Sequence, residues 1–109
     1  MKKIGGRYRS SFLQKVNVAL RLVEKDTQSL RTRLMDELEA MFKIAKDAAE
    51  AARASGAKPR EVQNWMRIMG YLSQVMNSLS KSFDEAKALE YLKNMERMMR
   101  ESEGNSEKG

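Results

Sequence analysis

The chain has 109 residues, enough for one domain, and a net charge of +6. It contains neither Cys nor His, which excludes disulfides, thiolate or imidazole metal sites, and catalysis by cysteine or histidine. About half of the residues are Ala, Glu, Lys, Leu or Arg, a composition typical of long helices and coiled coils. We therefore expect an all-α protein.

Residues 1–9, MKKIGGRYR, form a basic segment without an acidic side chain. Gly5 and Gly6 predict a flexible arm, and no apolar stretch follows that would indicate a signal peptide. Cations on such an arm can bind phosphates, and Tyr8 and Phe12 could stack on unpaired bases. The first candidate nucleic-acid contacts are therefore Lys2, Lys3, Arg7, Tyr8 and Arg9. The alternative is that these cations only solubilise the chain end.

Residues 10–54 contain no Gly or Pro and carry apolar side chains in a heptad pattern counted from Leu13, which predicts one long helix. Ser10 or Ser11 is the expected N-cap. At ~1.5 Å per residue this helix would be roughly 68 Å long. Glu37 would place a charge on the seam, unless a small rotation turns Leu38 inward.

Gly56 and Pro59 predict the end of that helix and the start of the next, at 59–80. After residue 86 the apolar pattern changes phase. Ser82 and Glu85 match a capping box, so a third helix is expected at 83–101. The pattern leaves open whether the chain kinks or turns fully near 80–82. The polar residues 102–109 are expected to be a disordered tail.

These elements predict a single helical domain, residues 10–101, folded as a long antiparallel hairpin in which helices 59–80 and 83–101 run back along helix 10–54. A compact three-helix bundle is the alternative, and it would require a break near KDTQS, residues 25–29. The apolar sector is broader than a two-helix seam needs, so we expect a homodimer or a protein partner to cover the remainder. The candidate interface residues are Trp65, Met66, Ile68, Met69, Gly70, Tyr71, Val75, Met95, Met98 and Met99. Trp65 could instead anchor the core.

Two further basic groups extend the nucleic-acid hypothesis. One surrounds the hairpin turn and the other is a pair within the first helix. They comprise Arg53, Lys58, Arg60 and Arg67 at the turn, and Arg31 and Arg33 in the helix. In a hairpin, the N-terminal arm and the turn would lie at opposite ends of the molecule.

No motif indicates a catalytic centre, so we expect no enzyme activity, cofactor, metal or small-molecule substrate. The longest uncharged run, residues 68–80, is too short to span a bilayer, and a cytoplasmic protein is expected. The first functional hypothesis is a non-catalytic adaptor or accessory subunit that docks on a larger protein, within replication-type DNA or RNA machinery. The alternatives are a basic nucleic-acid-binding or architectural protein, and a helical hairpin that self-assembles.

Overall fold

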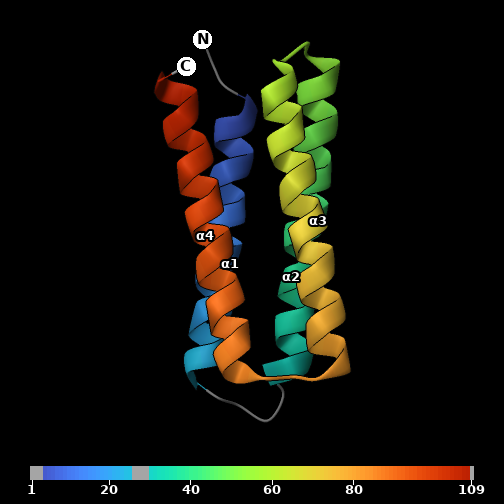
Figure 1. Ribbon diagram of the computed structural model, residues 1–109, viewed down its shortest axis with the longest axis vertical. Helices are drawn as coiled ribbons and strands as arrows, with labels where there is room; N and C mark the ends of the chain where they lie inside the picture. The colour runs from blue at the N-terminus through green and yellow to red at the C-terminus, as the bar shows by residue number, and fades with distance from the viewer. Residues whose placement is uncertain (1–3, 26–29, 109) are drawn as a thin grey trace.

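The computed structural model describes residues 4–25 and 30–108, with side-chain environments for 6–23 and 30–101. Within these ranges the chain forms α1 (Ile4–Lys25), α2 (Leu30–Ala54), α3 (Pro59–Lys81) and α4 (Glu85–Lys108), and no strand. Successive helices are antiparallel, so the molecule is an up-down-up-down four-helix bundle (Figure 1). The all-α class expected from composition is confirmed.

The single helix expected at 10–54 is wrong, because α1 ends at Lys25 and α2 begins at Leu30 and packs beside it. The Cα extents are 44 × 20 × 16 Å, shorter than the roughly 68 Å of a continuous helix. The KDTQS segment contains Asp, Thr and Ser, which favour caps and turns over helix interiors. Because α2 folds back against α1, one chain buries the broad apolar sector that a second molecule was expected to cover. The described residues form four helices, so the expected hairpin and the alternative three-helix bundle are both wrong.

The outer ends of α1 and α4 extend beyond their expected limits. α1 begins at Ile4, so residues 4–9 of the expected flexible arm are helical, and Ser10 and Ser11 lie inside the helix rather than capping it. α4 continues to Lys108, beyond the expected end at residue 101. Burial of side chains in the first turns of α1 offsets the low helix propensity of its two glycines. Lys2 and Lys3 lie outside the described residues.

The α2–α3 connection has the predicted chemistry. Gly56 has a φ of +75°, the left-handed conformation that favours glycine. Its N–H donates to the carbonyl of Arg53 at 3.2 Å, and the N–H of Ala57 donates to that of Ala52 at 2.9 Å. This is the Schellman pattern of helix ends. Pro59 is the first residue of α3, which confirms the predicted turn.

The α3–α4 connection is a full reversal rather than a kink (Figure 1). Oδ1 of Asp84 accepts hydrogen bonds from the N–H groups of Ala86 at 2.9 Å and Lys87 at 3.2 Å. Asp84 is therefore the N-cap of α4, and the expected capping box of Ser82 and Glu85 is wrong. Ser82 is instead the C-cap residue of α3, where its N–H donates to the carbonyl of Ser78 at 3.1 Å.

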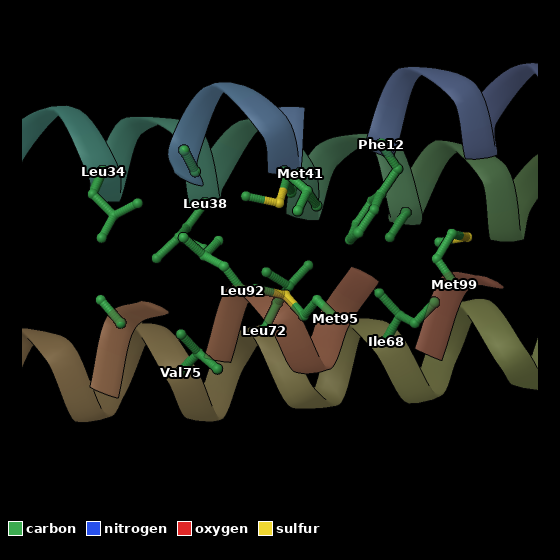
Figure 2. Close-up of a cluster of buried hydrophobic side chains, with 14 of the residues drawn as sticks. Phe12, Leu34, Leu38, Met41, Ile68, Leu72, Val75, Leu92, Met95 and Met99 are labelled. Carbon is green, nitrogen blue, oxygen red and sulfur yellow. The ribbon is translucent and has the colours of Figure 1, made fainter. Parts of the chain in front are cut away.

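The core fills the space between all four helices with aliphatic side chains and methionines (Figure 2). Four side chains of α1 are buried: Phe12, Val16, Ala19 and Val23. Val16 and Val23 are seam positions of the expected heptad pattern. Phe12 and Ala19 are buried in place of the expected Leu13 and Leu20, which are half-buried. Leu38 is buried and Glu37 is turned toward α1, where it lies 3.4 Å from Nζ of Lys15. The rotation considered for that position is thus present.

Candidate functional site

Exposed cations from three helices and a turn gather at one end of the bundle. The N-terminus of α1 and the α2–α3 connection both lie at this end (Figure 1), whereas the expected hairpin would have separated them. We define the basic end as the exposed side chains of Arg7, Arg53, Lys58, Arg60 and Arg67. Folding α1 back against α2 therefore brings Arg7 of the predicted arm to the end of the bundle that carries the predicted turn group.

None of these five cations is ion-paired with a carboxylate of the described residues. Among the described residues, Arg53 donates to the sulfur of Met66, at 4.0 Å. By contrast, two other arginines at this end of α4 are neutralised. Nε of Arg97 lies 4.0 Å from Oε2 of Glu101, and Nη2 of Arg100 lies 3.2 Å from Oε2 of Glu96. Thus no described carboxylate pairs with a cation of the basic end.

Arg9, a predicted nucleic-acid contact, is buried instead, with an exposed fraction of 5%. Its Nη2 donates to Oε1 of Glu61 at 3.3 Å, which links α1 to α3. Oε2 of the same carboxylate accepts from Nε1 of Trp65 at 3.2 Å. Phe12 packs edge-on against Trp65 with centroids 6.1 Å apart. Arg9 and Phe12 therefore stabilise the fold, and Trp65 is a core anchor.

The third predicted basic group lies far from the basic end. Arg31 and Arg33 are at the start of α2, at the opposite end of the bundle's 44 Å axis. Nη2 of Arg31 donates to the carbonyl of Ser80 at 2.7 Å and ties α2 to the last turn of α3. The Arg31 and Arg33 pair and the basic end therefore do not form one contact patch.

Most of the predicted protein-interface residues lie in or against the core. The fully covered ones are Trp65, Ile68, Val75, Met95 and Met99, and the half-buried ones are Met69, Tyr71 and Met98. Only Met66 and Gly70 of the set are exposed. Met66 is 52% exposed, and a Cβ added at Gly70 would meet no atom within 4 Å. The intramolecular bundle thus covers the apolar surface that had suggested a partner.

The α3–α4 seam contains a polar cluster that the sequence did not reveal. Tyr71 and Tyr91 pack edge-on with centroids 6.3 Å apart. Nδ2 of Asn94 donates to the hydroxyl oxygen of Tyr71 at 3.1 Å. The hydroxyl groups of Ser78 and Tyr91 hydrogen-bond each other, also at 3.1 Å. Tyr71 and Ser78 share one face of α3, and Tyr91 and Asn94 share one face of α4. The sequence did not show that these two faces pack against each other, because that requires the four-helix arrangement. The cluster is internally satisfied and structural.

A surface groove between α1 and α2 was also missed. It has a volume of about 410 Å³. Its lining residues are Arg7, Tyr8, Ser11, Gln14, Lys15, Ile44 and Asp47. Only Arg7 and Tyr8 were predicted to have a function. The remaining residues become neighbours only once α1 and α2 are separate antiparallel helices.

Within the described part of the chain, no cluster of three acidic side chains is arranged to hold a metal ion. None of the described helices combines the length and the apolarity needed to cross a bilayer. Comparisons of the chain with protein-family models, curated proteins and solved structures found no match. The basic end and the α1–α2 groove are therefore the surface features of the described residues that bear on function.

Proposed function

We propose that this protein is a non-catalytic helical module that binds the phosphate backbone of a nucleic acid through its basic end. The observation that carries the proposal is the gathering of Arg7, Arg53, Lys58, Arg60 and Arg67 at one end of the bundle, with no carboxylate partner among the described residues. Clustered cations attract a polyanion and release its condensed counterions on binding.

The rigidity of the bundle supports this assignment. Arg53 and Lys58 flank a connection held by two backbone hydrogen bonds, and Arg60 and Arg67 project from α3. Their backbone positions are thus fixed before a ligand binds. A preorganised set of cations loses less conformational freedom on binding than cations on a flexible arm.

The test is the affinity for a labelled DNA or RNA oligonucleotide, measured by fluorescence anisotropy at several salt concentrations. We expect affinity to fall steeply with salt, with a slope of about −0.9 per phosphate contacted in duplex DNA. The double variant Lys58→Glu/Arg60→Glu should lower affinity by at least about tenfold and flatten this slope by about 1–2.

The matched control is Arg33→Glu/Lys81→Glu, which changes the net charge equally at the opposite end of the bundle. It should weaken binding much less than the variant of the basic end. Equal losses from both double variants would mean that net charge alone drives binding. Affinity that does not respond to salt would contradict the proposal outright.

The adaptor function is the second candidate. It is favoured by one observation: the exposed side of α3 between Arg67 and Lys81 carries only uncharged side chains, and Met66 borders it. The double variant Gln74→Glu/Asn77→Glu, at two exposed positions of this face, should abolish a protein complex formed through it while preserving oligonucleotide binding. Loss of oligonucleotide binding in this variant would argue against two separate surfaces.

A further inference from the structure

The α1–α2 groove adjoins the basic end, and the two share Arg7. We propose that this groove binds one unpaired nucleotide of a single-stranded nucleic acid, with its base between the helices and its phosphate at Arg7. This inference rests on the proposed function, and it assigns the class of nucleic acid. The groove's volume of about 410 Å³ lies at the lower end of the ~300–1,000 Å³ of small-ligand sites.

The groove offers an apolar surface for a base. Tyr8 and Ile44 pack against the core but stay partly exposed. The other aromatic residues at this end, Phe12 and Trp65, are buried against each other. Aromatic side chains stack on any unpaired base, because every base has a π-face. Tyr8 is therefore the aromatic residue placed to contact one.

The polar side chains along the groove match the edge of a base. Ser11 and Gln14 supply both donors and acceptors from α1, and Asp47 supplies a carboxylate from α2. Asp47 lies 3.7 Å from Nζ of Lys43. A carboxylate accepts hydrogen bonds from the amino groups of adenine, cytosine or guanine and repels phosphate. Lys15, the other cation that lines the groove from α1, is paired with Glu37. The phosphate is thus directed to Arg7.

This arrangement favours single strands over duplexes. In a duplex each base is stacked between its neighbours and paired along its edge, so it cannot enter a groove between two helices. The cations of the basic end would then hold the adjoining phosphates of the same strand. A free mononucleotide would lack those contacts and should bind far more weakly.

The experiment compares a short single-stranded oligonucleotide with an abasic strand of the same length, the matching duplex and a mononucleotide. We expect the base-bearing strand to bind at least about fivefold more tightly than the abasic strand, the lower limit for stacking one base. Tyr8→Leu, which keeps an apolar side chain against the core, should remove this difference. Tyr8→Phe should retain it, and thermal unfolding checks that both variants fold.

The outcomes separate this inference from the proposed function. If the base-bearing and abasic strands bind equally and Tyr8→Leu has no effect, the groove inference is wrong while the basic end keeps its role. If no strand binds, both fail. Mononucleotide binding as tight as that of the oligonucleotide would overturn the assignment to a strand.

Discussion

At the scale of single residues, the ion pair between Arg9 and Glu61 contributes to the stability of the fold. The buried guanidinium of Arg9 has Glu61 as its carboxylate partner among the described residues. Replacing Glu61 with Ala would leave Arg9 without its ion-pair partner and Trp65 Nε1 without its acceptor. We expect a loss of about 2–3 kcal/mol in the free energy of unfolding, below the ~3–5 kcal/mol of a fully buried pair, because Glu61 remains 18% exposed. Urea denaturation measures this loss.

The control is the double variant Arg9→Met/Glu61→Gln, which removes both charges and keeps an acceptor for the indole. Replacing a buried ion pair with neutral groups is often close to neutral in stability. The double variant should therefore unfold within about 1 kcal/mol of the natural chain. A loss as large as that of Glu61→Ala would show that the charge itself is needed.

Residue roles were only partly predictable from the sequence. Trp65 was expected to anchor either the core or an interface, and the structure places it in the core. The assignment of Arg9 to nucleic acid missed its burial, because its partner Glu61 is 52 residues away in the chain. A basic segment shows which side chains are cationic. It does not show which cation a distant carboxylate will neutralise.

At the scale of helices, the Asp84 cap observed at the start of α4 can be compared with the Ser82 cap that the sequence predicted. Asp84→Ala removes the acceptor for two backbone N–H groups and should cost about 1 kcal/mol. Ser82→Ala should cost less than about 0.5 kcal/mol, as expected for a surface position away from such contacts. Chemical denaturation of both variants decides between them. A larger loss for Ser82→Ala would restore the capping box.

Helix boundaries were predictable where a residue has special backbone chemistry. Gly56 and Pro59 mark the α2–α3 connection because few other residues suit those positions. The break between α1 and α2 carries no such residue. Its weak helix formers are common inside helices, so only the burial gained by folding back decides against a continuous helix.

At the scale of the whole molecule, the broad apolar sector indicated that a two-helix seam does not bury all of the apolar side chains. The expectation that a homodimer or a partner covers the remainder did not anticipate that one chain supplies four helices. The same heptad pattern suits a dimer of long hairpins and a single four-helix chain. This choice changes the candidate site. A long hairpin would separate Arg7 from Lys58 and Arg60 of the same chain, whereas the four-helix chain brings them to the same end.

A distance across the bundle tests this architecture directly. Because the chain contains no cysteine, Ser10→Cys and Gln63→Cys would place two spin labels at exposed positions of α1 and α3. The bundle predicts a separation comparable to its 20 × 16 Å cross-section, measured by pulsed electron resonance. A continuous helix over 10–54 would instead separate these sites by roughly 60 Å. Dilution with unlabelled protein removes distances between molecules, so a short distance that survives dilution must come from one folded chain.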